Sequence, residues 1–407
     1  MTTPGPAGLL TRAVADAAVA IDGPTYLYDL THLDGHARAI RAALPPGIEV
    51  LYAVKANPDP RLLAVLERHV DGWEVASGGE LAHLRRHVPG RPAYFAGPGK
   101  TDAELAAALA AGVTFHVESA EELRRLDALV SAAGTAGRAA AGRSRAAVLL
   151  RVNLPVPAGL PLALAMGGRP SPFGMDPAEA DACGHALAAG ALSGIDFRGV
   201  HAHLASGLDA PACADMADVT LRWAVGFGAR HRLRVAEIDV GGGMTVDYRR
   251  PWARFDWTGY GERLSRTIRA VGAGAVVRIE PGRSLTAYSG WYATRIVDLK
   301  LSHGQWFAIV AGGTHHLRTP VAKGHDQPFA VLPTHTWTRP WPRSETSGPV
   351  TVVGQLCTPK DVLAREVPVD RVGVGDVVVF ALAGAYGFTI SHHDFLMHPR
   401  PAVRHVS

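Results

Sequence analysis

The first two-thirds of the chain alternates between short apolar runs and longer amphipathic stretches. Eight of the short runs are rich in β-branched and aromatic residues, as buried strands are, and segments with helical spacing of apolar positions separate them. We predict these strands at Ile48–Val54, Trp73–Ala76, Tyr94–Ala96, Phe115–Val117, Ala147–Val152, Phe197–His203, Glu237–Val240 and Val276–Glu280. Eight strand–helix units in roughly 250 residues are typical of a (β/α)8 TIM barrel, an α/β fold.

Two of the predicted helices carry a start signal. The motifs Thr101-x-x-Glu104 and Ser119-x-x-Glu122 have the spacing of a capping box, in which a hydroxyl and a carboxylate bond the first free N–H groups of a helix. Two other segments interrupt the rhythm. We interpret Ser131–Arg145, which is rich in Ala and Gly, as an exposed helix end or a loop. Pro155–Pro172, which is rich in Pro and Gly, we interpret as a long βα loop on the active face.

The pattern changes after Glu280. Strand-like runs follow one another with Gly, Pro and Asp turns and no long helical stretch, which predicts an antiparallel β domain. The runs are Trp291–Lys300, Trp306–Ala311, Gln327–Leu332, Pro349–Val353 and Asp376–Ala381, and Thr25–Asp29 could add a further strand. We therefore expect residues 1–34 to join the β domain, residues 35–284 to form the barrel and residues 285–407 to form the β domain.

The composition is that of a folded protein. Apolar residues make up 47% of the 407 residues and charged residues 19%, which excludes long disorder. The net charge of +4 lies in no basic block, so we expect no nucleic-acid partner. Three scattered cysteines without a CxxC pair favour neither a disulfide framework nor a structural zinc. Without a signal-peptide pattern or a long apolar stretch, we expect a cytoplasmic protein that binds no membrane.

Two lysines stand at the ends of predicted strands, where a TIM barrel collects its chemistry. Lys55 directly follows Val50–Val54, and apolar surroundings there would favour the neutral amine that forms a Schiff base. The alternative is a lysine whose amine extends to solvent. Lys100 ends the turn Gly97-Pro98-Gly99, and we interpret it as a solvated lysine on a glycine turn.

Later strand ends carry a histidine, a glycine run and a carboxylate. His203 ends the sixth predicted strand. Gly241, Gly242 and Gly243 follow the seventh and would expose backbone N–H groups, which predicts a phosphate seat; the alternative is a flexible turn. Glu280 ends the eighth strand and, if buried, needs a cationic partner. A lysine, a ring to stack on, a phosphate seat and a carboxylate are what pyridoxal 5′-phosphate (PLP) needs from a protein.

Several motifs extend this pattern along the chain. They are Tyr52-Ala53-Val54-Lys55-Ala56-Asn57, Ala76-Ser77-Gly78-Gly79-Glu80, Glu280-Pro281-Gly282-Arg283, Gly384-Ala385-Tyr386 and a cysteine motif at Cys357. With them the chain resembles the fold-type III PLP-dependent decarboxylases, which include the diaminopimelate, ornithine and arginine decarboxylases. The resemblance implies an alanine racemase-like fold, PLP as cofactor, and release of CO2 from an L-amino acid moiety.

The resemblance also implies roles for individual residues. Lys55 would bind PLP covalently, His203 would stack on its ring, and Glu280 would pair with the ring nitrogen. The matching positions are, for the phosphate, Ser206, Gly242, Gly282, Arg283 and Tyr386 and, around the ring, Glu74, Glu80 and Arg151. Cys357 would reach the active site from the other subunit of a homodimer. Either Cys357 or Lys55 would then return a proton to Cα.

Two departures from the family pattern bear on the substrate. Thr358 follows the cysteine where ornithine- and diaminopimelate-type enzymes usually have an acid, and Gly312 replaces another acid of the ornithine-type enzymes. A distal amine would lose charge-assisted contacts there, so we expect the far end of the substrate to be a polycarboxylate. The cationic or hydrogen-bonding candidates are Arg169, Thr314, His315, His316, Arg318, Thr358, Lys360 and Asp361; the alternative is that some are solvated loop residues.

Several segments resemble one branch of the family more closely. The segments similar to the decarboxylases of staphyloferrin B-type siderophore assembly are Gly168-Arg169-Pro170, Phe173-Gly174, Val353–Val362, Ala383–Gly387 and Ser391–Leu396. That branch acts on diaminopropionate amide-linked to citrate, so the resemblance implies a citrate-linked substrate in siderophore biosynthesis. The alternative within the family is a diaminopimelate- or ornithine-type decarboxylase of a basic amino acid.

Three interpretations of another kind stay open. They are a non-catalytic regulator with a PLP fold, an amino acid racemase, and a metal-dependent barrel hydrolase suggested by His201-Ala202-His203 and His392-His393-Asp394. Barrel hydrolases usually carry the His-x-His pair on an early strand with further ligands on later strands. Here the pair comes on the sixth predicted strand, so we expect no metal.

Overall fold

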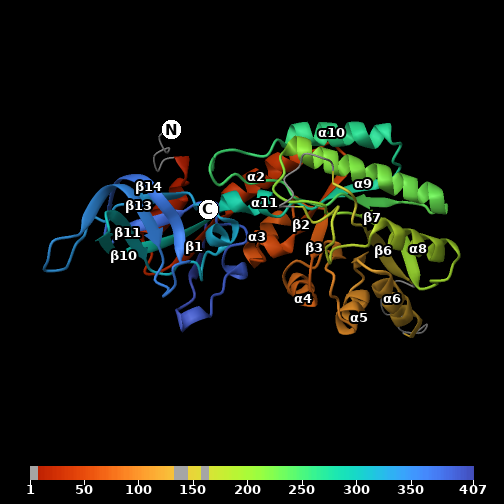
Figure 1. Ribbon diagram of the computed structural model, residues 1–407, viewed down its shortest axis with the longest axis horizontal. Helices are drawn as coiled ribbons and strands as arrows, with labels where there is room; N and C mark the ends of the chain where they lie inside the picture. The colour runs from red at the N-terminus through yellow and green to blue at the C-terminus, as the bar shows by residue number, and fades with distance from the viewer. Residues whose placement is uncertain (1–7, 133–144, 157–164) are drawn as a thin grey trace. The chain divides into compact units, whose positions relative to one another are not determined.

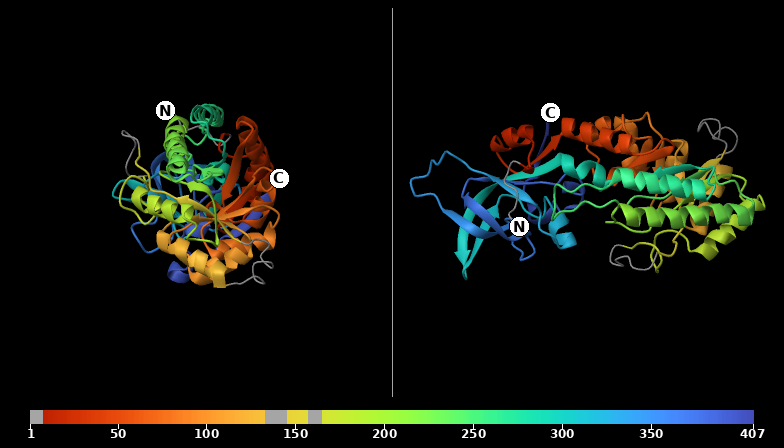
Figure 2. Two further views of the ribbon diagram at one scale, coloured as in Figure 1. Left: turned by 90° about the vertical axis from the view of Figure 1, so that its right-hand side faces the viewer. Right: turned by 90° about the horizontal axis from the view of Figure 1, so that it is seen from above.

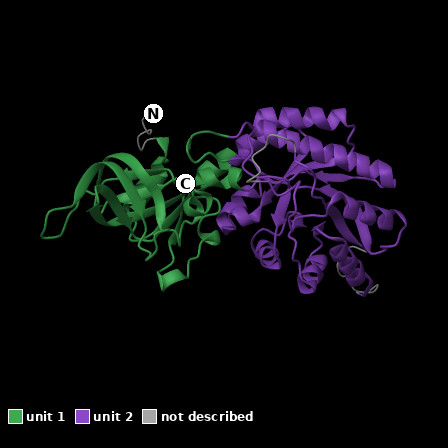
Figure 3. Cartoon of the chain, in the orientation of Figure 1, with its two compact units in different colours: residues 1–36, 246–254, 283–407 green, residues 37–245, 255–282 purple. Residues whose placement is uncertain are grey.

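The computed structural model describes residues 8–132, 145–156 and 165–407. The chain divides into two compact units (Figure 3). Unit 1 comprises residues 1–36, 246–254 and 283–407, and unit 2 comprises residues 37–245 and 255–282. The predicted loops at Ser131–Arg145 and Pro155–Pro172 lie partly outside the described residues. The predicted domain boundaries after residues 34 and 284 stay a prediction.

Unit 2 contains a closed barrel of eight parallel strands, which confirms the predicted TIM barrel (Figure 1). The strands are β2 Ile48–Ala53, β3 Gly72–Val75, β4 Ala93–Phe95, β5 Thr114–Val117, β6 Ala146–Arg151, β7 Ile195–His201, β8 Glu237–Asp239 and β9 Val276–Ile279. They follow one another around the barrel in chain order, and β2 pairs with β9 to close it. The predicted strands agree closely because strands buried on both faces are near-continuous apolar runs.

Helices surround these strands, as the left view of Figure 2 shows. They are α2 Leu30–Ala43, α3 Pro60–Leu66, α4 Gly78–His87, α5 Asp102–Ala110, α6 Ala120–Ala132, α8 Pro177–Ala188, α9 Ala210–His231 and α10 Trp257–Ala270. Thr101 and Glu104 form the complete predicted capping box at α5. At α6 only half of the box forms. Ser119 Oγ accepts from Glu122 N at 3.0 Å, but the Glu122 carboxylate turns to Lys100 Nζ and Glu118 N.

Unit 1 contains an eight-stranded sheet made from both ends of the chain. Its strands are β1 Thr25–Asp29, β10 Gly290–Ser302, β11 Gln305–Val310, β12 Phe329–Leu332, β13 Glu345–Val353, β14 Val362–Gly373, β15 Val377–Phe380 and β16 Ala402–Val406. Most pairs are antiparallel, as predicted, but β11 with β13 and β1 with β16 are parallel. These exceptions arise where strands distant in sequence pair without a hairpin. Sequence analysis missed β16 and also β14, whose central Pro368 argues against a strand.

Short elements complete the described part of unit 1. They are the helices α1 Arg12–Val19, α11 Arg283–Thr286 and α12 Thr319–Lys323, with 3-10 turns at Ala287–Ser289, Phe388–Ile390 and Phe395–Met397. A compact apolar core that includes Val14, Leu27, Trp291 and Val379 joins α1 to the sheet. Among the described residues, no helix has both the length and the apolar character needed to cross a membrane.

Candidate active site

Lys55 lies at the carboxyl end of β2, in the 3-10 turn Val54–Ala56. Its Nζ donates to both carboxylate oxygens of Glu74, at 2.7 and 2.9 Å, and Glu74 is buried at the end of β3. The Lys55 side chain is 46% exposed. The expected apolar surroundings were therefore wrong: the ammonium of Lys55 is fixed by a buried carboxylate at a partly open position.

Glu80 stands beside this pair, at the start of α4. Ser77 caps the helix by accepting from Glu80 N, and the Glu80 carboxylate reaches back to Ala76 N at 2.7 Å. The pKa of Glu80 is raised above its ordinary value, mainly by burial. The hydrogen bond from Ala76 N opposes this shift, and the charge of Glu74 adds to it. The motif Ala76–Glu80 is thus a helix start that places a second acid near Lys55.

His203 follows β7 and is held in one tautomer. Its Nδ1 accepts from Gly242 N at 2.9 Å, so the ring proton lies on Nε2, which is 3.4 Å from Ser206 Oγ. Burial, with the charges of Arg151 and Lys55, lowers the pKa of His203 well below its ordinary value. The ring is therefore neutral at pH 7 and can present a flat face to an aromatic ligand.

The glycine run after β8 forms a close-packed turn. Gly241 and Gly243 have φ of +72° and +99°, which disfavour any side chain. A Cβ on Gly242 would lie 2.2 Å from the carbonyl oxygen of Glu280, and one on Gly243 would lie 2.3 Å from that of Ala205. Because these contacts leave no space for a side chain, the turn presents only backbone atoms at this end of the barrel.

Glu280 follows β9 and is buried. Its Oε2 lies 3.3 Å from His201 Nε2, whereas its Oε1 receives no hydrogen bond from a donor among the described residues. Burial and then the charge of Glu74 raise the pKa of Glu280 to about 8. A carboxyl group in this position calls for a proton or a positively charged partner.

Sequence analysis missed an ion-pair network beside this site. The Arg151 guanidinium pairs with Glu118, which also accepts from Gly97 N and Gly174 N. Next to it, Lys100 Nζ donates to Glu122 and to two backbone carbonyls at 2.7–2.8 Å. Lys100 is 5% exposed, so its interpretation as a solvated lysine was wrong.

Two predicted phosphate residues belong to unit 1. The Arg283 guanidinium lies 4.5 Å above the Tyr386 ring, and its Nη1 donates to Tyr248 Oη at 2.7 Å. Tyr386 has a φ of +50°, unusual for a residue with a side chain, and Thr319 Oγ1 donates to its carbonyl oxygen. Unit 1 thus holds its own arginine–aromatic cluster, in which Tyr248 was not predicted.

The predicted substrate residues fall into two groups. Arg169, Arg318 and Lys360 are exposed, as is the thiol of Cys357, and Thr358 is half-buried. In contrast, Thr314, His315, His316 and Asp361 are buried. The Asp361 carboxylate accepts from Thr314 N, Thr314 Oγ1 and Leu356 N at 2.6–2.8 Å. Asp361 therefore ties the loop after β11 to the cysteine loop and has few lone pairs left for a ligand.

Gly312 leaves no room for the acid that it replaces. It has a φ of +83°, and a Cβ there would lie 2.2 Å from Tyr292 Oη. The absence of a carboxylate at this position is therefore built into the packing of unit 1.

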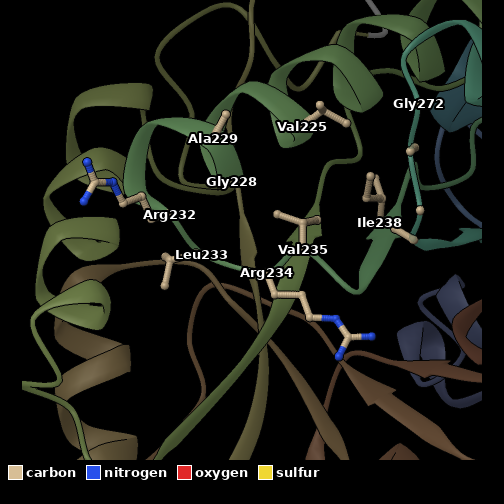
Figure 4. A pocket seen from close by; sticks show the side chains of 12 residues that line it. Val225, Gly228, Ala229, Arg232, Leu233, Arg234, Val235, Ile238 and Gly272 are labelled. Carbon is tan, nitrogen blue, oxygen red and sulfur yellow. The ribbon is translucent and has the colours of Figure 1, made fainter.

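A cavity of about 400 Å³ lies at the other end of the barrel, where β8 and β9 begin (Figure 4). It is lined by the end of α9, the following residues Arg232–Val235, and Gly272–Ala275. None of the predicted site residues lines it. The carboxyl ends of the strands, where the polar side chains gather, remain the candidate active site.

Comparison with known proteins identifies the class to which this barrel and site belong. Residues 30–287 match the family model described as pyridoxal-dependent decarboxylase, pyridoxal binding domain. The chain therefore belongs to the pyridoxal-dependent decarboxylases, and the predicted resemblance and cofactor, PLP, are confirmed. This membership argues against the metal-dependent hydrolase suggested by His201 and His203. His201 Nε2 faces Glu280, whereas His203 contacts Gly242 N and Ser206 Oγ.

Individual relatives sharpen this assignment. The chain is 39% identical to the 2-[(L-alanin-3-ylcarbamoyl)methyl]-2-hydroxybutanedioate decarboxylase of Staphylococcus aureus, over 92% of each chain. It is 30% identical to the diaminopimelate decarboxylase of Deinococcus radiodurans, over 97% of this chain and 93% of that one. The structure of diaminopimelate decarboxylase from Helicobacter pylori with L-lysine matches with a TM-score of 0.82 at 22% identity, over 96% and 93% of the chains, which supports the shared fold.

Proposed function

We propose that this enzyme decarboxylates an amino acid unit joined to citrate, the diaminopropionate conjugate of siderophore assembly. The observation that carries the proposal is the 39% identity to an enzyme whose name specifies such a conjugate, an alanine unit linked through an amide to a 2-hydroxybutanedioate. Identities near 30% to diaminopimelate decarboxylases support the alternative substrate less well. A biosynthetic role of this kind suits the cytoplasm.

The barrel residues fit PLP by two structural features. Glu280 Oε1 is buried with no donor among the described residues, as expected of an acid that awaits a positively charged ring nitrogen. The second feature is the Gly241–Gly243 turn, which admits no Cβ, although Gly241 N and Gly242 N already donate to Asp239 Oδ1 and His203 Nδ1 and so are not offered to a phosphate. Lys55 would hold the cofactor covalently and His203 would stack on it. Ser206, Gly282, Arg283 and Tyr386 are proposed as further phosphate residues.

The chain's own residues then divide the chemistry between them. When bound, PLP supplies an electron-accepting ring that stabilises the negative charge left at Cα as CO2 departs. Glu74 holds the Lys55 amine at the strand end. Glu280 would stabilise the positive charge of the ring nitrogen. Arg151, fixed by Glu118, and Glu80 add charge nearby. Lys55 or Cys357 would return a proton to Cα.

The residues proposed for the distal part of the substrate are those that remain accessible. The exposed guanidinium groups of Arg169 and Arg318 can bind carboxylates, and Thr358 can donate a hydrogen bond. Thr314, His315 and Asp361 are buried, so we assign them to positioning of the loops around Cys357 rather than to direct contact. The packing of Gly312 against Tyr292 excludes a carboxylate that would bind a distal ammonium.

A substrate panel tests the proposed specificity. Purified enzyme with PLP should release CO2 from the citryl–diaminopropionate amide with a kcat/KM at least about 100-fold above that for ornithine, lysine or diaminopimelate. Such a ratio matches the two charge-assisted contacts that the amine substrates lose. Free diaminopropionate serves as the control that lacks the citrate tail. Preference for any of the three basic amino acids would contradict the proposal.

We also propose a homodimer in which Cys357 serves the active site of a second copy of the chain. Lys55→Ala and Cys357→Ala chains, each nearly inactive alone, should recover activity when unfolded together and refolded. Mixed dimers would hold one intact site in two, so recovery should reach about a quarter of the wild-type rate. The measurement is CO2 release, with the separately refolded variants as controls. Activity no higher than the sum of those controls would show that Lys55 and Cys357 act from one chain.

A further inference from the structure

A buried polar cluster lies behind Glu280, inside the barrel, and the proposed function uses only its outermost member. His116 on β5 and His201 on β7 stack with ring centroids 4.0 Å apart and an angle of 13° between the planes. Both side chains, together with Asp239 on β8, are at most 1% exposed. Polar side chains buried together inside a barrel need hydrogen-bond partners, since each buried polar group left unpaired destabilises the fold.

Three of these groups, His116, Asp239 and Glu280, are linked through Gly241 of the glycine turn, and the two contacts of His116 are longer than hydrogen bonds. His116 Nδ1 lies 3.7 Å from Glu280 Oε1, and His116 Nε2 lies 3.9 Å from Asp239 Oδ2. Asp239 Oδ1 accepts from Gly241 N at 2.9 Å, and Gly241 O accepts from Glu280 N at 2.9 Å. His116 thus stands between the acid proposed for the ring nitrogen and the acid that fixes the proposed phosphate turn.

The protonation states make this arrangement consistent. Burial lowers the pKa of His116 and of His201 well below the ordinary value, and the charge of Arg151 adds to it, so both rings are neutral. Burial and then the charge of Glu280 raise the pKa of Asp239 well above its usual range, so Asp239 keeps its proton. A neutral imidazole has one donor and one acceptor, which are the two groups needed to join a carboxylate to a carboxylic acid.

We propose that His116 is a positioning residue that holds Glu280 as a carboxylate when a positively charged ring nitrogen faces it. Its Nδ1–H would donate to one lone pair of Glu280 Oε1 and leave the other for a ligand, its Nε2 would accept the proton of Asp239, and His201 Nε2–H would donate to Glu280 Oε2. Both contacts of His116 are longer than hydrogen bonds in this structure, and catalytic hydrogen bonds often shorten only when the ligand is in place. The role rests on the proposed function, because it matters only if Glu280 faces the ring nitrogen.

The test compares PLP with its carbocyclic analogue, in which C–H replaces the ring nitrogen. Apoenzyme is titrated with each ligand, and the dissociation constant is read from the absorbance of the bound ligand. His116→Phe retains a ring that can stack on His201 but has no nitrogen. It should weaken PLP binding about tenfold, the low end for a hydrogen bond to a charged group, and change analogue binding less than about twofold.

Controls separate this role from a general loss of packing. Tyr94→Phe alters a second ring next to His116, with centroids 5.8 Å apart, and should change neither constant more than about twofold. If His116→Phe does not fold, His116→Leu takes its place with the same expectation. Equal weakening of both ligands, or of neither, overturns the inference.

Glu280→Gln, titrated in the same way, distinguishes the two levels of the argument. This variant should also discriminate between PLP and the analogue. If it does and His116→Phe does not, the inference about His116 fails alone. If Glu280→Gln shows no discrimination, the proposed role of Glu280 fails, and the role of His116 fails with it.

Discussion

Alanine in place of Lys55 should lower the rate of decarboxylation by more than about 1,000-fold, within the range that one positioned acid–base group contributes. We propose two functions for Lys55, covalent attachment of the cofactor and proton transfer to Cα. The structure already holds its Nζ against both oxygens of Glu74 at the carboxyl end of β2. No other group in the described part of the barrel presents an amine in this position.

Chemical labelling provides the direct measurement. Borohydride reduction of the wild-type enzyme with PLP should leave the label on Lys55 and none on Lys100, whose amine is enclosed by Glu122 and two carbonyl oxygens. Lys300→Ala, which removes an exposed lysine of β10, is the matched control and should retain wild-type activity. Label on another lysine, or full activity in Lys55→Ala, would refute the assignment.

Glu280→Gln should lower kcat about 100- to 1,000-fold, as the loss of one preorganised electrostatic contact does elsewhere. The amide has nearly the volume of the acid, so the barrel packing survives, but it cannot balance a positive charge on the ring nitrogen. Glu49→Gln is the control, because Glu49 is an acid of the same barrel that pairs with Arg278 near the opposite strand ends. An unchanged kcat in Glu280→Gln would exclude the proposed contact.

The pH dependence of thermal stability independently tests the burial of Glu280. The pKa of Glu280 is raised to about 8, so ionisation of this group in the cofactor-free protein opposes folding. Protonated Glu280 stabilises the folded apoenzyme fully at a pH below the pKa that Glu280 has in the unfolded chain. This stabilisation is lost as the pH rises through about 8. The apoenzyme should therefore lose thermal stability over this interval more steeply than Glu280→Gln. Parallel melting curves at every pH would contradict the raised pKa.

Local sequence patterns carried much of the fold and part of the site. The barrel strands could be predicted because each is a short apolar run whose burial needs no knowledge of its neighbours. The strand-end position also pointed to Lys55 and Glu280, since parallel strands place their carboxyl ends on one face. β14 could not be found in this way, because its alternation is broken by Pro368 and its pairing with β13 contains several register shifts.

The polar interior of the barrel had a weaker signal. His116 and Asp239 are polar residues in buried strands, and such exceptions indicate function or a paired core. Their partners, however, lie on other strands. His116 meets Glu280 from a position more than 160 residues away in sequence, and Lys100 meets Glu122 because two successive βα loops are adjacent.

The order of buried and exposed segments along the chain therefore determined the architecture and the family, because hydrophobic periodicity and short motifs are properties of adjacent residues. Only the tertiary structure of the barrel decided which charged side chains pair with each other and which remain to bind a ligand. The folded barrel brings Glu74 to Lys55, Glu118 to Arg151 and His116 to Glu280. Burial then lowers the pKa of His116 and raises that of Glu280. Electrostatic energies depend on the distance between charges and on the exclusion of solvent, and both are fixed only when the strands pack together.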